Sequence, residues 1–149
     1  MKLFLSGTLF DDFQLVEGVI KTYITVNIDG YANEEFYKND YTHTPCTNEY
    51  ASWSELRPLC MELIRGKNTP LYMKFILQKA PSSLAEKAGG SAPLEARSLI
   101  LNLTFSEQGL KLTTAINFSG FYPDSSLPEL WDNHIGKLLR TAELKFEVI

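Results

Sequence analysis

The chain has 149 residues, a net charge of −4 at pH 7, and 44% hydrophobic against 21% charged residues, which excludes disorder and a coiled coil as overall descriptions. The acidic balance argues against a dedicated nucleic-acid binder, because phosphate binding calls for a basic domain or a basic stripe. The length fits one domain over residues 1–149, with halves at 1–80 and 97–149 joined by a flexible loop over 81–96.

The first ten residues are apolar but too short to span a membrane, and they run into Asp11-Asp12 without a small-residue cleavage site. They therefore predict a short helix ended by Gly7 and not a signal segment. The two cysteines, Cys46 and Cys60, are too few for a disulfide framework and are typical of free thiols in a reducing compartment. We expect a cytoplasmic protein with no membrane partner.

β-branched and aromatic residues dominate 13–29, which predicts one bent strand or two strands that meet near Lys21. A long, tyrosine-rich polar loop over 31–51 follows. Ser52-x-x-Glu55 has the spacing of a capping box, and the apolar stripe behind it predicts an amphipathic helix to about Arg65.

The rest of the chain alternates between strand and helix patterns. Its predicted elements are a strand over 71–80, the flexible connection over 81–96, a strand pair over 98–105 and 110–118, a helix opened by a second capping box at Ser126-Leu-Pro-Glu129, and a closing strand with Leu144, Phe146 and Val148.

Short matches link the two halves: Asn27–Tyr31 resembles Asn117–Phe121, and Lys74-Phe75 resembles Lys145-Phe146. We predict an α+β fold with a single antiparallel sheet, two main helices on one face, and a tandem β-β-α-β pseudo-repeat. By fold analogy alone, this plan resembles a sliding-clamp domain. The analogy would direct basic residues of the helical face toward DNA, namely Arg57, Arg65, Lys67, Lys137 and Arg140.

The sequence contains no recognisable catalytic or cofactor motif. His43, Cys46, Cys60 and His134 could supply a zinc site by count, but their spacing is wrong and two of them lie in apolar helix stripes. A His43 and Cys46 dyad lacks the third group that would orient it. We therefore assign no catalytic residue, no metal and no cofactor.

Four motifs of the chain carry a family resemblance: Val26-Asn-Ile-Asp-Gly30, Trp53-Ser-Glu-Leu-Arg-Pro-Leu-Cys60, Leu63-Ile-Arg-Gly-Lys-Asn-Thr-Pro70 and Trp131-Asp132. With these motifs the chain resembles an uncharacterised bacterial family of the Clostridia type, a domain of unknown function. The resemblance covers nearly the whole chain and implies a bacterial, cytoplasmic single domain. It carries no assigned activity, so no functional residue follows from it.

We interpret the chain as a non-enzymatic binding or interaction module. Its candidate binding residues are basic side chains of and near the first long helix, and aromatic or histidine side chains in or next to the 31–51 loop: Arg57, Arg65, Lys67, Tyr37, Tyr41, His43 and Trp53. A protein partner or a homo-oligomer fits this interpretation; nucleic acid is not expected. The alternatives are a small-ligand binder or enzyme with a pocket under 31–51, and a clamp-like nucleic-acid-associated protein.

Overall fold

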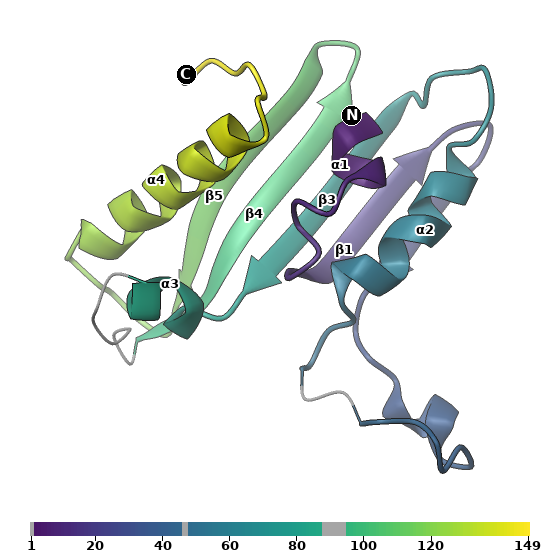
Figure 1. Cartoon of the computed structure of the whole chain (residues 1–149), viewed down its shortest axis with the longest axis horizontal. Helices are drawn as coiled ribbons and strands as arrows, with labels where there is room; N and C mark the ends of the chain where they lie inside the picture. Colours follow the sequence, from purple (N-terminus) through teal and green to yellow (C-terminus); the bar gives the residue numbers. More distant parts are fainter. Residues whose placement is uncertain (1, 46–47, 88–94) are drawn as a thin grey trace. The chain divides into compact units, whose positions relative to one another are not determined.

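The described residues of the chain build an α+β fold with one five-stranded antiparallel sheet (Figure 1). The structure is a computed structural model and describes residues 2–45, 48–87 and 95–149. The strand order is β2-β1-β3-β4-β5. The described elements are α1 (Lys2–Ser6), β1 (Gln14–Lys21), β2 (Thr25–Asp29), the 3-10 helix η1 (Glu34–Tyr37), α2 (Trp53–Leu63), β3 (Tyr72–Lys79), α3 (Ser82–Lys87), β4 (Ala96–Ser106), β5 (Gly109–Phe118) and α4 (Ser126–Thr141). The predicted fold class is confirmed.

The chain divides into two compact units. The first comprises Met1–Leu77 and Leu103–Lys111, and the second comprises Gln78–Asn102 and Leu112–Ile149. Both units therefore include parts of β4 and β5.

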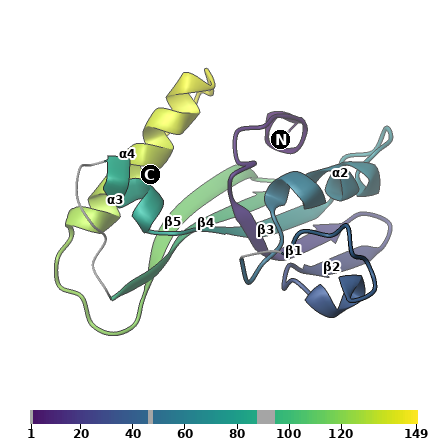
Figure 2. The ribbon, with the colours of Figure 1, turned by 60° about the horizontal axis from the view of Figure 1, so that its bottom comes forward.

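The first unit has an aromatic core between its helices and strands. Trp53, the first residue of α2, has its ring centroid 5.1 Å from Phe4 of α1 and 5.1 Å from Phe75 of β3. All three side chains are buried. Figure 2 shows α1 and α2 on the same side of β1 and β3. The packing buries Phe4 and Leu5 of α1 and Trp53 and Cys60 of α2, and burial of this kind is the main source of helix stability in proteins.

One glycine lets the chain leave the sheet where the long loop begins. Gly30 follows β2, and its amide donates to the Val16 carbonyl at 3.0 Å. A Cβ atom at position 30 would lie 1.7 Å from the carbonyl oxygen of Leu15. Because no side chain fits there, this close backbone approach requires glycine.

The second unit packs α3 and α4 with its portions of β4 and β5. Trp131 of α4 is buried, and its Nε1 donates to the carbonyl oxygen of Ile100 in β4 at 2.9 Å. Leu99 and Leu101 of β4 are fully buried. The hydrogen bond fixes the position of α4 along the strand, while the apolar contacts supply the burial.

Two sequence predictions in the second unit are wrong. Residues 82–87, predicted as flexible connection, form the helix α3, whose Leu84 is buried. No strand follows α4, although Leu144, Phe146 and Val148 alternate as in a strand; the residues after Thr141 are irregular. The pseudo-repeat thus lacks its last element in the structure and stays a hypothesis.

The predicted capping boxes do not form as expected. Ser52, the N-cap of α2, makes no side-chain capping hydrogen bond. Ser126, the predicted cap of α4, is instead the first residue of that helix, and its N-cap Ser125 makes no such bond either. The amide of Ser126 instead donates to Oδ1 of Asp124 at 2.8 Å. The apolar stripes predict the extent of both helices. Whether the first backbone amides of a helix find a hydrogen-bond acceptor depends on the geometry of the preceding loop.

Candidate functional site: an aromatic arm

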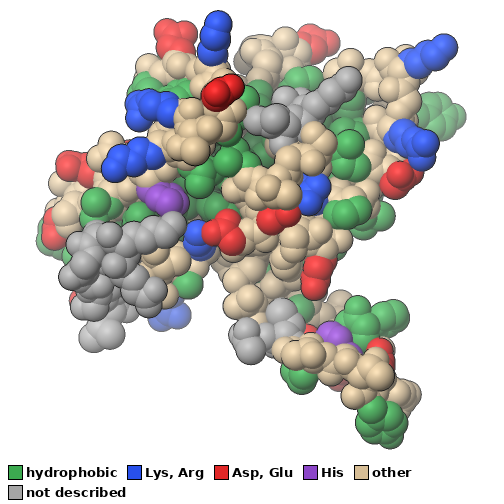
Figure 3. All heavy atoms as spheres, viewed as in Figure 1, with side chains coloured by type: hydrophobic (Ala, Val, Ile, Leu, Met, Phe, Trp, Pro, Cys, Tyr) green, Lys and Arg blue, Asp and Glu red, His purple; other side chains and the backbone are tan. Residues whose placement is uncertain are grey.

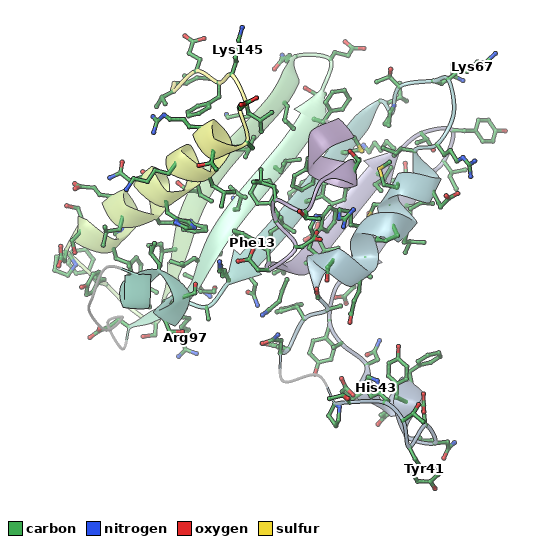
Figure 4. All side chains as sticks on the ribbon, in the orientation of Figure 1. Phe13, Tyr41, His43, Lys67, Arg97 and Lys145 are labelled. Carbon is green, nitrogen blue, oxygen red and sulfur yellow. The ribbon has the colours of Figure 1, made fainter. Side chains whose placement is uncertain are left out.

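Residues 31–45 and 48–50 form an excursion of the first unit, which we call the aromatic arm. In Figures 1 and 4 it leaves the unit between β2 and α2 and ends near Tyr41. Its base is closed by an isolated antiparallel bridge between Tyr31 and Tyr50. The amide of Ala32 donates to the Glu49 carbonyl at 2.9 Å, and the rings of Tyr31 and Tyr50 meet edge to face at 6.2 Å. A paired base therefore holds the two ends of the arm together.

The distal part of the arm is organised around His43. Its ring stacks on Tyr37, with centroids 3.8 Å apart and planes 9° from parallel. Its Nε2 lies 3.0 Å from Oε2 of Glu34. Phe36 packs edge to face on Tyr37 at 4.9 Å. The 3-10 helix places Glu34 and Tyr37 on one side, three residues apart, so one imidazole reaches both.

A side-chain turn shapes the segment that leads back to His43. Oδ1 of Asp40 accepts hydrogen bonds from the hydroxyl of Thr42 at 2.6 Å and from its amide at 2.9 Å. These bonds hold the pKa of the Asp40 carboxyl below its usual range, with the nearby His43 adding to the effect. Such an Asx turn fixes the backbone locally without a buried core.

The outer surface of the arm is aromatic and acidic. Phe36 is 82% exposed and Tyr41 is 98% exposed. Residues 31–50 contain four acidic side chains and one lysine, so their net charge is −3 when the histidine is counted as neutral. In Figure 3, green hydrophobic side chains occupy the end of the arm, close to the purple histidine. Large exposed aromatic side chains grouped in this way are typical of protein-binding surfaces.

The structure does not bring the predicted site residues into one place. Tyr37, Tyr41 and His43 lie in the arm, whereas Trp53 is fully buried in the core of the first unit. Arg57 makes a two-bonded ion pair with Asp11 at 2.9 Å. Arg65 and Lys67 are exposed beyond the end of α2, and Arg65 Nη1 lies 3.5 Å from Glu62.

Sequence reasoning overlooked Phe36 and Glu34 as members of this cluster. The sequence carries a signal for Phe36, which lies in a stretch of polar residues and tyrosines. Exposing a phenylalanine to water costs free energy, so its presence there is informative. The predicted partner of His43, Cys46, lies outside the described residues. Within the described parts of the chain, no group of three or more His, Cys, Asp or Glu side chains could hold a metal ion.

The α-helices among the described residues are 5 to 16 residues long. None of them combines the length and the apolar character needed to cross a bilayer.

Comparisons with known proteins identify the chain at the level of its family. Neither the curated proteins nor the solved structures include a match to it. The sequence model of the family of unknown function DUF5721 matches residues 2–147, and the chain therefore belongs to that family, as the resemblance of its motifs indicated.

Proposed function

We propose that this protein is a non-enzymatic binding module whose aromatic arm docks a partner protein. The observation that carries the proposal is the pair of exposed aromatic side chains, Phe36 and Tyr41, on an excursion with a closed base. Aromatic side chains dominate the free energy of protein interfaces, because each covers a large area and loses few rotatable bonds on binding.

The internal contacts of the arm support this role. The stack of His43 on Tyr37 and the Asp40 turn are formed before any partner arrives. A surface held in its binding conformation loses less conformational entropy on association than a floppy loop would. The same contacts explain why a hydrophilic segment of this length can present its aromatic residues in a fixed arrangement.

The charge of the arm narrows the chemistry of the partner. With a net charge of −3, the arm favours a partner surface that is basic and partly apolar. Arginine suits it best, because a guanidinium both pairs with carboxylates and stacks on aromatic faces. We place this interaction in a bacterial cytoplasm, which is consistent with the family resemblance and with the two cysteines of the sequence.

The other functions inferred from the sequence stay predictions. They are a small-ligand or enzymatic pocket under residues 31–51 and a clamp-like association with nucleic acid. The ion pair of Arg57 with Asp11 weighs against association with nucleic acid, because it neutralises one of the five basic side chains that the clamp analogy would direct toward DNA phosphates.

A selection of random peptides on the immobilised full chain tests the proposal. We expect enriched peptides to combine arginine or lysine with apolar residues. Phe36→Ala and Tyr41→Ala should each weaken their binding at least about tenfold. The matched control is Phe121→Ala, which removes a phenylalanine that is 90% exposed in the second unit and should leave binding unchanged. Peptides that bind the arm variants as tightly as the wild type would refute the proposal, and so would the failure to enrich any peptide.

A further inference from the structure

A second surface of the first unit has the opposite chemistry to the arm. It consists of the β1–β2 turn and the loop that follows α2. A hydrogen bond from the Leu71 amide to the Lys21 carbonyl, 2.8 Å long, joins the two segments. Tyr23 in the turn is fully exposed, and Ile24 and Leu71 are largely exposed. We call this surface the basic tip; its residues are Lys21, Tyr23, Ile24, Arg65, Lys67 and Leu71.

The basic tip is positive as well as apolar. Its three cations, Lys21, Arg65 and Lys67, are exposed, and Nη1 of Arg65 lies 3.5 Å from Oε2 of Glu62. Lys21 also places its Nζ 5.4 Å from the ring centroid of Tyr72. The tip therefore combines cationic groups with exposed apolar side chains. This is the chemistry that the arm is expected to bind.

The arm and the tip belong to the same unit but lie at opposite ends of it. Figure 4 shows Tyr41 and His43 at one end of the first unit and Lys67 at the other. Figure 3 shows blue basic side chains beside green hydrophobic ones at the Lys67 end. Because this separation prevents the arm from reaching the tip of its own unit, the two complementary surfaces can meet only between two copies.

We propose that this protein self-associates head to tail, with the aromatic arm of one copy docked on the basic tip of the next. The inference rests on the proposed function of the arm and names its partner: a second copy of the chain. A contact between two different surfaces leaves one arm and one tip unused in a dimer, so association continues until a ring closes or a filament grows. Opposite charges at the contact make the assembly sensitive to salt.

Sedimentation velocity of the full chain tests the association itself. Over about a hundredfold range of protein concentration, we expect the average mass to rise above that of one chain. Raising sodium chloride from about 0.05 M to about 0.5 M should shift this rise to higher protein concentration. A chain that stays monomeric at every concentration in low salt overturns the inference.

Mixing two defective variants tests the head-to-tail geometry. The arm variant is Phe36→Ala with Tyr41→Ala, and the tip variant is Arg65→Glu with Lys67→Glu. Each alone should be monomeric, because each lacks one of the two surfaces. Together they should form a dimer that grows no further, since only one intact arm and one intact tip remain per pair. Circular dichroism establishes that both variants fold, and Phe121→Ala should assemble like the wild type.

The outcomes separate this inference from the proposed function. A monomeric wild type that still binds basic peptides through its arm overturns self-association and leaves the arm as a docking surface for another protein. Assembly that persists in the arm variant, or a mixture that yields no dimer, also overturns the inference. Loss of both peptide binding and assembly in the arm variant supports the two proposals together.

Discussion

The guanidinium of Arg57 holds the carboxylate of Asp11 through two hydrogen bonds, Nε to Oδ1 and Nη2 to Oδ2, each 2.9 Å long. Its Nη1 also donates to the carbonyl of Leu5 at 3.4 Å. The pair is partly shielded from water, with 18% of the arginine and 25% of the aspartate side chain exposed. It therefore fastens α2 to the segment that follows α1.

Loss of this pair should destabilise the protein measurably. We expect Arg57→Ala to lower the free energy of unfolding by about 1–3 kcal/mol, because it leaves a partly buried carboxylate without its partner. The measurement is urea unfolding of the full chain followed by circular dichroism. Arg65→Ala is the control: its contact with Glu62 is longer and exposed, so its effect should stay below about 0.5 kcal/mol. Equal effects of the two substitutions would contradict a structural role for Arg57.

The two tryptophans predict different responses to the same substitution. Trp131 Nε1 donates to the Ile100 carbonyl, whereas Trp53 Nε1 is buried and has no hydrogen-bond partner among the described residues. Replacing either by phenylalanine removes similar volume, but only Trp131→Phe also removes a hydrogen bond. We expect Trp131→Phe to cost about 1 kcal/mol more than Trp53→Phe in urea unfolding. An equal or larger cost for Trp53→Phe would indicate that its indole N–H is in fact satisfied.

Glycine at position 30 should be irreplaceable. Gly30→Ala would place its Cβ 1.7 Å from the Leu15 carbonyl oxygen, so the backbone must move and β1 must shift against the base of the arm. We expect a loss of about 3 kcal/mol or more, or no folded protein at all. Gly120→Ala, where a Cβ meets no atom within 4 Å, should change stability by less than about 0.5 kcal/mol. Two-dimensional amide spectra and urea unfolding of both variants provide the comparison.

Burial should make the Cys60 thiol unreactive in the folded protein. The side chain is fully buried, and this desolvation raises its pKa from 9.0 to about 11. At pH 8 the reactive thiolate is therefore about a hundredfold scarcer than for an ordinary cysteine. In a Cys46→Ser background, an aromatic disulfide reagent should modify Cys60 slowly without denaturant and quickly in urea. Rapid modification of the native variant would contradict the burial.

The same thiol predicts how stability depends on pH. Between pH 9.0 and about 11 the unfolded chain loses the Cys60 proton while the folded chain keeps it. The unfolded state then binds fewer protons, so the contribution of this group to stability is complete below pH 9 and declines as pH rises through that window. Cys60→Ala should flatten this part of the pH profile in urea unfolding. An unchanged slope would show that other groups cause the decline.

Local patterns in the sequence determined most of the elements. The alternation of apolar residues predicted β3, β4 and β5, and the apolar stripes predicted α2 and α4. Both patterns arise because a strand or helix must bury one of its faces, and its residues return to that face with a fixed period. These patterns required no knowledge of the partner element. Capping failed as a guide, since a serine can satisfy a helix amide only if the preceding backbone points its hydroxyl the right way.

Tertiary contacts decided the elements that the patterns missed. The alternating residues after α4 resemble a strand, but the chain turns at Glu143, which has a left-handed φ of 58°. The Leu144 amide then donates to the Leu139 carbonyl, and Arg140 lies 5.4 Å from the ring centroid of Phe146. These contacts hold the segment at the end of the helix. The short helix α3 forms where the chain was expected to be flexible, because Leu84 finds a buried position in the second unit.

The candidate site shows the same division between sequence and tertiary structure. The tyrosines, histidine and cations that attract attention are visible in the sequence, and so is the acidic character of residues 31–50. Which of them remain available for binding was decided by the fold: Trp53 entered the core, Arg57 paired with Asp11, and Tyr41 stayed exposed. The physical reason is that the periodicity of a strand or helix can indicate which face a residue occupies, while its exposure depends on whether a distant segment covers that face.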